Sequence, residues 1–352
     1  MIDKNNNSNF LQHAARFTLP VAMAALLLLI VTCGEAGPSV VSPGHAPVAP
    51  TATSQPKTKH SQSPSSKPSD NDCNFPIFDM HAHWQPDLPV DFMIESMDRA
   101  NVKWAVIMPN QGREYDATMQ LTEISERFYP FVGFQNRGWL EQRSGFLLNL
   151  RKALGTGKFK GLGEVLLRHY AVPERGAPDV YIPATNESVS QVVDIAAEYN
   201  VPVVIHMEAE EKTVSELEKL LRMHPNTNVI RAHAGRSDIS MAGKMLSTYP
   251  NLYIDLAVLD PSRRYGRERN SITTADGKLR LEWKELLTKF RYRVVTGSDI
   301  PFQDQWSLYV HIMDSQRALL DQLPRQVAED IGYRTAAGLL GASLPYGMCF
   351  EK

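Results

Sequence analysis

Cysteine is scarce in this chain. The 352 residues include only Cys33, Cys73 and Cys349, and no Cys-x-x-Cys pair occurs. Three cysteines are too few to build a disulfide scaffold, and their spacing does not indicate a thiolate metal site. An excess of charge of one sign is lacking too, because the formal net charge is −2, so composition gives no reason to expect nucleic acid as a partner. With 43% hydrophobic and 22% charged residues, the composition is that of an ordinary globular protein.

Long apolar runs are also missing. The run near the N-terminus, Leu19 to Thr32, covers fourteen residues. As a helix it would rise only about 21 Å, against a hydrocarbon core of ~30 Å. Lys4 and Arg16 precede it, which is typical of a secretory signal peptide over residues 1–35 rather than of a retained transmembrane span. We therefore expect an exported protein of the periplasm or cell envelope.

The end of this signal resembles the lipobox of bacterial lipoproteins, in which the cysteine becomes the lipidated first residue of the mature protein. The segment is Leu29 to Gly34. The resemblance implies membrane attachment through a lipidated Cys33. Thr32 departs from the pattern, where Gly, Ala or Ser normally stands, and ordinary cleavage after Ala36 stays open as the alternative.

The next segment, residues 36–72, changes composition sharply. From Gly37 to Asp72 it is rich in Pro, Ser and Thr and contains no Leu, Ile, Phe, Tyr or Trp. Such a segment cannot bury enough apolar surface to offset the entropy lost on ordering. It is predicted to be a disordered linker between the signal and a domain over residues 73–352.

In that domain, short apolar or β-branched runs alternate with stretches of helical period. The eight runs are Pro76–Trp84, Lys103–Pro109, Phe131–Asn136, Gly161–Leu167, Val201–Met207, Val229–Ala234, Leu252–Val258 and Arg293–Asp299. Eight strand-helix repeats predict an α/β fold of the (β/α)8 TIM-barrel type. An open doubly wound sheet is the alternative, but it ordinarily has a glycine-rich turn after its first strand, where this chain has His81-Ala82-His83-Trp84.

Metal-ligand residue types occupy five of the eight strand ends. They are His81 and His83 on the first strand, Glu164 on the fourth, His206 on the fifth, His233 on the sixth and Asp299 on the eighth. Side chains alternate along a strand, so His81 and His83 point the same way. The C-terminal strand ends of such a barrel form its active site. Imidazoles with a carboxylate suit zinc and related ions, which lower the pKa of bound water from 15.7 to about 7.

The pattern resembles the amidohydrolase superfamily, and more closely its amidohydrolase-related branch, which includes metal-dependent hydrolases and decarboxylases. The resemblance covers residues 75–345, and its most specific elements are the His-x-His of the first strand and Gly297-Ser298-Asp299 on the eighth. It implies that His81, His83, His206 and Asp299 bind a divalent metal. Asp299 would also accept the proton of the attacking water.

The resemblance implies further roles for two residues. His233 would either bind a second metal or orient water and substrate, which makes it a candidate catalytic residue with Asp299. Glu164 resembles the carboxylate that bridges two metals in the binuclear branches, whereas the decarboxylase branch has no ligand on the fourth strand. We expect one or two ions per chain, with zinc as the first choice and Glu164 as a ligand.

Three functions stay open at this point. The first is a metal-dependent hydrolase that cleaves a C–N or C–O bond of a small molecule. The second is a metal-dependent decarboxylase of the amidohydrolase-related branch. The third is a surface lipoprotein that binds ligands without catalysis, which the complete ligand set disfavours. The substrate and the oligomeric state are not readable from the sequence.

Several polar residues near the strand ends have weaker roles. Arg137 and Arg168 could clamp a substrate carboxylate or phosphate, or pair with acids in the loops. Arg231 lies two residues before His233, so an inward position with an ion pair to Asp79 or Asp255 is expected. We also predict a disulfide between Cys73 and Cys349, because both lie near the N-terminal face of the barrel in an oxidising compartment.

Overall fold

The computed structural model describes most of the predicted barrel domain. The described residues are 74–85, 87–109, 115–134, 139–140, 145–173, 177–259, 271–300 and 303–344. The signal peptide, the lipidation of Cys33, the linker, the Cys73–Cys349 disulfide and the role of Arg137 lie outside them and stay predictions. None of the described helices is long and apolar enough to cross a membrane.

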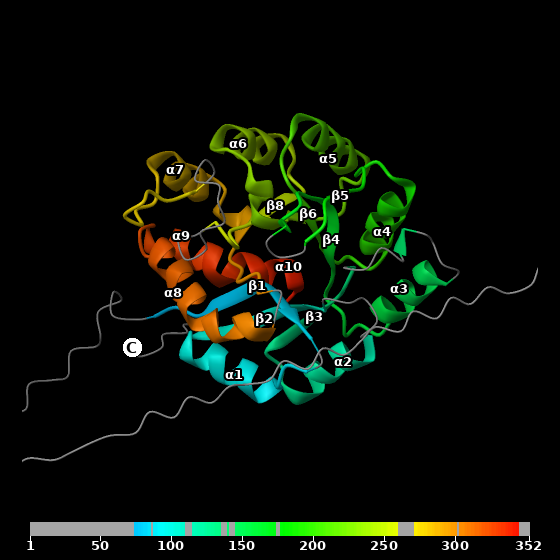
Figure 1. Cartoon of the computed structure of the whole chain (residues 1–352), viewed down its shortest axis with the longest axis horizontal. Helices are drawn as coiled ribbons and strands as arrows, with labels where there is room; N and C mark the ends of the chain where they lie inside the picture. Colours follow the sequence, from blue (N-terminus) through cyan, green and yellow to red (C-terminus); the bar gives the residue numbers. More distant parts are fainter. Residues whose placement is uncertain are drawn as a thin grey trace, which may run out of the picture. The chain divides into compact units, whose positions relative to one another are not determined.

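Eight parallel strands form a nearly closed barrel (Figure 1). In spatial order they are β1 Ile77–Trp84, β2 Val102–Pro109, β3 Phe128–Val132, β4 Gly161–His169, β6 Val203–Met207, β7 Val229–Arg231, β8 Leu252–Asp255 and β9 Val294–Val295. Backbone bonds bring the first and last strands together: the Met80 N–H donates to Thr296 O at 3.0 Å, and the Asp299 N–H donates to His81 O. The prediction of a (β/α)8 barrel is confirmed.

One strand was not predicted. The two-residue β5, Val180–Tyr181, pairs antiparallel with the end of β4, through Arg168 and His169. It lies in the connection between the fourth and fifth barrel strands and does not change the order of the barrel strands.

Helices surround the strands (Figure 1). They are α1 Val90–Arg99, α2 Tyr115–Ile124, α3 Phe146–Gly155, α4 Glu187–Glu198, α5 Glu211–Met223, α6 Ile239–Thr248, α7 Leu281–Lys289, α8 Tyr309–Leu320, α9 Arg325–Glu329 and α10 Thr335–Leu340. A π-helical turn, Asp330–Arg334, joins α9 to α10 and contacts β1 and β9. Because helices cover the outer face of the sheet, its strands are buried on both faces, and all eight residues of β1 are buried.

Local sequence explains where individual helices begin. The Asn186 side chain accepts from the Ser188 N–H at the start of α4, and Glu210 with Thr213 forms a capping box at the start of α5. Helix α5 then buries Leu217 and Leu220 at helical spacing against the sheet.

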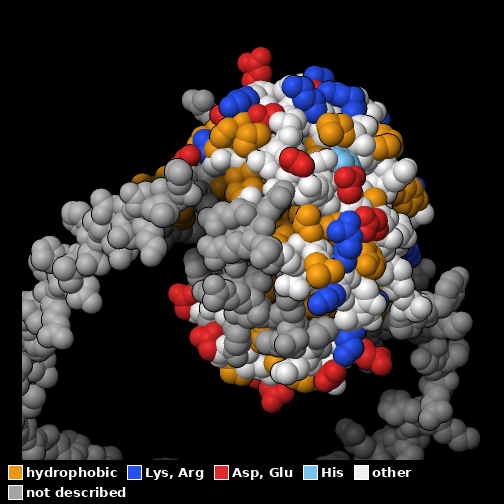
Figure 2. Space-filling view, turned by 90° about the vertical axis from the view of Figure 1, so that its right-hand side faces the viewer, with side chains coloured by type: hydrophobic (Ala, Val, Ile, Leu, Met, Phe, Trp, Pro, Cys, Tyr) orange, Lys and Arg blue, Asp and Glu red, His pale blue; other side chains and the backbone are white. Residues whose placement is uncertain are grey.

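The large apolar side chains that are exposed lie one by one on different helices. Examples are Ile124 on α2, Leu148 on α3, Met223 on α5 and Leu281 on α7. On the face shown in Figure 2, acidic and basic side chains are interspersed among hydrophobic ones. Single exposed apolar residues of this kind are normal for a globular protein and do not mark a docking surface.

Four predicted strands end earlier than expected. The third, sixth, seventh and eighth runs were placed to Asn136, Ala234, Val258 and Asp299, but β3 ends at Val132, β7 at Arg231, β8 at Asp255 and β9 at Val295. For the sixth and seventh runs the reason is visible at Asp255, whose Oδ1 accepts from the His233 N–H at 2.8 Å and from the Ala257 N–H at 3.1 Å. A side chain thus replaces the carbonyl partners that would have continued the ladder.

Candidate metal centre

His81 and His83 point into the mouth of the barrel from β1. They are separated by one residue, so the pleat places both rings on the inner face, where their centroids are 5.1 Å apart. Both residues are at most 1% exposed. A Cβ on Gly297 would come within 2.6 Å of the His81 Cβ, so only glycine lets the segment after β9 approach β1 this closely.

Glu164 lies at the centre of the predicted residues. Its Oε1 is 2.9 Å from His206 Nδ1, 3.6 Å from His81 Nε2 and 3.7 Å from His233 Nε2. Its Oε2 is 3.8 Å from His83 Nε2. A carboxylate in the middle of four imidazoles can bind a shared cation or accept their protons.

Asp299 approaches the same imidazoles from the segment that follows β9. Its Oδ1 is 3.5 Å from His83 Nε2 and 3.7 Å from His81 Nε2, and its Oδ2 is 3.7 Å from His233 Nε2. The Asp299 side chain is 18% exposed, whereas that of Glu164 is 6% exposed. Asp299 is therefore the carboxylate of the centre that solvent or a substrate reaches more easily.

His233 reaches the centre from a left-handed turn. After β7 the backbone takes positive φ angles at four successive residues: 55° at His233, 48° at Ala234, 63° at Gly235 and 51° at Arg236. Side-chain-bearing residues pay roughly 1–2 kcal/mol each for this conformation. A strained backbone turn of this kind persists only where the surrounding contacts hold it in place.

Arg231 holds that turn, and its predicted ion pair was wrong. Its guanidinium donates to Met207 O and to Ser237 Oγ at 3.0 to 3.1 Å, and among the described residues no carboxylate pairs with it. Strand alternation predicted that Arg231 and His233 share a face, but the strand ends between them. A Cβ on Gly235 would lie 2.0 Å from Arg231 Nε, so the turn packs directly on the guanidinium. Burial lowers the pKa of Arg231 to about 10.

Two buried aspartates support the centre and were not predicted as part of it. Asp255 Oδ2 accepts from His81 Nδ1 at 2.9 Å, which leaves Nε2 as the ring nitrogen that faces the other ligands. Asp79 accepts from the backbone N–H groups of His81 and Ser298 and from the Tyr309 hydroxyl, at 2.9 to 3.1 Å. In the sequence, only their positions could have indicated this role, because Asp79 lies two residues before His81 and Asp255 ends its strand.

His206 stands slightly apart from the other imidazoles. Its Nδ1 faces Glu164, whereas its Nε2 is 3.9 Å from Glu208 Oε1. Glu208 in turn lies 3.4 Å from Arg236 Nε. Burial alone would raise the pKa of Glu208, but the neighbouring His206 imidazole and the charge of Arg236 lower it to about 2. Glu208 therefore enters the site as an ionised side chain.

The donor geometry fits a divalent metal. Ligand atoms of His81, His83 and Asp299 lie within 4.8 Å of one another, and so do those of His81, Glu164 and His233. His206 belongs to neither group. Four buried imidazole nitrogens have no hydrogen-bond partner, namely Nε2 of His81, both ring nitrogens of His83 and Nε2 of His206. Buried polar atoms without partners are costly, and a cation bound by nitrogen and oxygen ligands would satisfy them.

The charges of the buried side chains also favour a bound cation. Burial alone would lower the pKa of His81, but the carboxylates of Asp255 and Glu164 raise it to about 10. Burial likewise opposes protonation of His206, yet Glu164 raises its pKa to about 9. Protons on these rings neutralise the carboxylates. A divalent cation would take over that role, because ligating imidazoles are neutral and metal binding releases their protons.

Arg168 serves the loop rather than the centre. Its Nε donates to Glu210 Oε1 at 2.8 Å, and its Nη1 donates to Asp179 Oδ1 at 2.9 Å. Its guanidinium also stacks on the Tyr170 ring, 3.8 Å from the centroid. The side chain is 9% exposed. The sequence left two roles open for Arg168, a substrate clamp and an ion pair in the loop, and the structure shows the ion pair.

A family model described as amidohydrolase matches residues 78–342. No curated protein matches the chain. The fold is similar to that of an uncharacterized TIM-barrel protein from Bordetella bronchiseptica, with 11% identity, a TM-score of 0.56 and coverage of 76% of this chain and 99% of that one.

Two further solved structures carry enzyme names. One is a probable 2-pyrone-4,6-dicarboxylic acid hydrolase from Acinetobacter baumannii with citric acid bound, at 17% identity, TM-score 0.53 and coverage of 76% and 100%. The other is a 2,6-dihydroxybenzoate decarboxylase from Rhizobium, at 14% identity, TM-score 0.50 and coverage of 76% and 98%. At these identities the likeness shows the barrel fold alone.

Proposed function

The chain belongs to the amidohydrolase family, and from that premise we propose that it is a metal-dependent hydrolase that cleaves a C–N or C–O bond of a small molecule. The observation that carries the proposal is the position of Glu164 among four buried imidazoles, with Asp299 beside them at the more exposed edge. This set combines ligands for a cation with a carboxylate that can move a proton.

The possible ligands form two groups that share His81. His81, His83 and Asp299 would hold one ion, and His81, Glu164 and His233 offer a second group of donors. Nitrogen and oxygen donors of this kind suit zinc. A bound divalent cation supplies a positive charge that polarises a carbonyl oxygen and makes a neighbouring water acidic at neutral pH.

The chain's own residues would do the remaining work. Asp299 would accept the proton of the attacking water at its more exposed carboxylate and pass it to the leaving group. Its Oδ2 lies 3.7 Å from His233 Nε2, so His233 can orient the same water or the substrate carbonyl. Asp255 would keep His81 in the tautomer whose Nε2 lone pair faces the cation.

The central carboxylate favours hydrolysis over decarboxylation. Glu164 is in reach of ligand nitrogens on both sides of the centre, which suits two ions that share an oxygen ligand. Decarboxylation requires a cation to bind the substrate but has no use for a hydrolytic water. The two chemistries release different products, so they can be separated directly.

The test begins with the full chain purified without chelator. We expect at least one equivalent of divalent metal by inductively coupled plasma mass spectrometry, and turnover of a member of a panel of amides, lactones and esters. His81→Ala should lose both metal and turnover, whereas the matched change His311→Ala, on the exposed face of α8, should keep both.

Product analysis decides between the chemistries. Release of acid together with an amine or alcohol supports the hydrolase. Release of carbon dioxide from an aromatic or unsaturated carboxylate, with no hydrolysis of the panel, would replace it with the decarboxylase. A His81→Ala protein that keeps its metal would remove the proposed centre altogether.

A further inference from the structure

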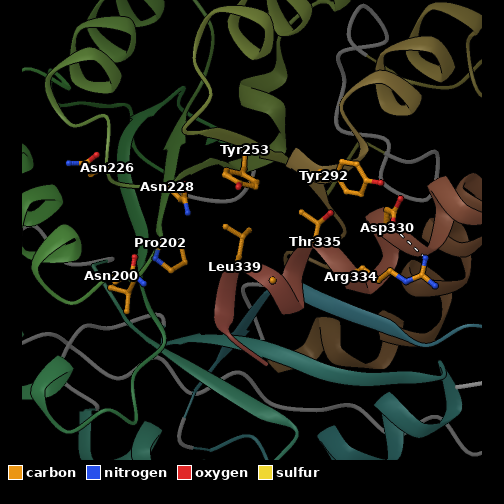
Figure 3. A pocket seen from close by; sticks show the side chains of 12 residues that line it. Asn200, Pro202, Asn226, Asn228, Tyr253, Tyr292, Asp330, Arg334, Thr335 and Leu339 are labelled. Carbon is orange, nitrogen blue, oxygen red and sulfur yellow. Dashed lines mark hydrogen bonds and ion pairs between the residues drawn. The ribbon is translucent and has the colours of Figure 1, made fainter. Parts of the chain in front are cut away.

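A cavity of about 470 Å³ opens at the end of the barrel where the strands begin, opposite the histidines at the strand ends. Figure 3 shows the residues that line it. Its walls come from the segments that lead into β6, β7 and β9, from β8, and from the π-helical turn and α10. Asn200, Asn226 and Asn228 lie on one side, Arg334 on the other, and Tyr253 with Leu339 between them (Figure 3). Pockets for small molecules are of this size, about 300–1,000 Å³.

Uncommitted polar groups gather in this cavity. The carboxamides of Asn226 and Asn228 and the hydroxyl of Tyr253 make no hydrogen bond to any described residue. Asn228 and Tyr253 are only partly exposed. Asn200 has a second explanation, because it follows α4 with φ +52°, a conformation that favours asparagine. Asn226, Asn228 and Tyr253 are therefore the residues whose polar groups are left for a ligand.

The charged groups of the cavity cancel one another. Arg334 lies 3.4 Å from Asp330 and also pairs with Glu329, and Asp330 lies 2.9 Å from Arg291. Glu329 also pairs with Arg325, but of these residues only Arg334 and Asp330 line the cavity, so its charged lining is one arginine paired with one acid. This pair offers no net charge to an ionic ligand, although its outer edge can still accept and donate hydrogen bonds.

The remaining walls are apolar and partly flat. The Tyr253 ring and Leu339 lie between the amide side and the charged side, and the Tyr292 ring, 57% exposed, stands at the charged side (Figure 3). Tyrosine offers a large apolar surface with a polar edge, so it can cover the C–H face of a ring whose rim carries hydroxyl groups.

We propose that this cavity binds a neutral, hydroxyl-rich ligand, namely a saccharide of one or two rings. A carboxamide both donates and accepts hydrogen bonds, and so does a sugar hydroxyl, whereas a carboxylate or phosphate only accepts and would call for uncompensated cations. Because the cavity and the metal centre lie at opposite ends of the strands, both can be occupied together. The site would anchor the protein to a glycan while the catalytic mouth stays open.

The test uses the full chain with three probes, cellobiose, maltose and di-N-acetylchitobiose, observed by saturation-transfer-difference NMR and titration calorimetry. We expect at least one disaccharide to bind. Asn228→Leu, which removes the amide at similar volume, should weaken binding about tenfold, the effect of one lost hydrogen bond. Tyr253→Phe should also weaken it. Asn149→Leu, the same change on an exposed residue of α3, should have no effect.

Three outcomes would overturn the proposal. They are no binding of any probe at 20 mM, binding that Asn228→Leu leaves unchanged, and binding of inorganic phosphate or acetate at the cavity in place of the sugars. His81→Ala serves as the reciprocal control, because it should remove metal and keep sugar binding. Failure of the saccharide site would thus leave the metal centre untouched.

Discussion

Asp255→Asn should remove the tautomer of His81 whose Nε2 can bind metal, while the fold stays in place. Asp255 Oδ1 accepts from two backbone N–H groups, those of His233 and Ala257, and Oδ2 accepts from His81 Nδ1 at 2.9 Å. An asparagine can keep both backbone bonds through its oxygen. Its NH₂ then faces His81 Nδ1, which must accept, so the ring proton moves to Nε2 and occupies the lone pair that binds metal.

The size of the effect follows from the role of such carboxylates. Removing the partner of a metal-ligating histidine typically weakens metal binding 10- to 100-fold, which corresponds to about 1.4–2.7 kcal/mol. The reverse orientation of the amide brings no relief, because its NH₂ would then face two backbone donors. The loss should therefore reach the upper part of this range.

The measurement is the metal dissociation constant, obtained by competition with a chromogenic chelator. A thermal melt of the metal-free protein checks the fold. The matched control is Asp238→Asn at the start of α6, where the side chain accepts from the Met241 N–H and asparagine caps a helix equally well. If Asp255→Asn is folded and binds metal within twofold of the wild type, the assignment of His81 Nε2 as a ligand atom is wrong.

Three further substitutions test residues in and around the metal centre. Gly235→Ala should lower the free energy of unfolding in urea clearly more than Gly157→Ala does. Gly157 has a similar positive φ but an open Cβ position, so its substitution should cost about 1 kcal/mol. Equal losses would show that the contact between Gly235 and the Arg231 guanidinium is unimportant. The folded pKa of Glu208, about 2, lies below the usual 4.5, so this group stabilises the fold above about pH 4.5 and loses its contribution as the pH falls toward 2. Glu208→Gln should therefore destabilise the metal-free protein at pH 7 and not at pH 2, and a difference that grows on acidification contradicts this. Glu164→Gln should lower the metal content from two ions to one, whereas one ion in both proteins excludes a bridging role.

The sequence could predict the parts of the centre that regular strands position. His81 and His83 alternate along an eight-residue strand, so their common direction follows from the pleat alone. The order of the barrel strands follows from eight strand-helix repeats in the same way. Glu164 also lies where the fourth strand predicts it, among the histidines.

The turn after β7 could not be predicted, because its cause is distant in the sequence. Asp255, 22 residues later, accepts the His233 N–H and ends the ladder. Arg231 then loses the alternation that would have turned it toward the aspartates, and bonds to Met207 O instead. The local sequence around His233 does not reveal that the Asp255 side chain accepts its N–H and redirects the backbone.

The two groups of ligand atoms have one member in common. His81 belongs to both, and because Asp255 occupies its Nδ1, a single nitrogen is left to bind an ion. Two ions cannot both take that lone pair. The first to arrive has three protein ligands, and the second has one fewer. Occupancy of the centre should therefore be negatively cooperative, with a titration curve of two steps in which the ion bound last is the first to leave when a weak chelator is added.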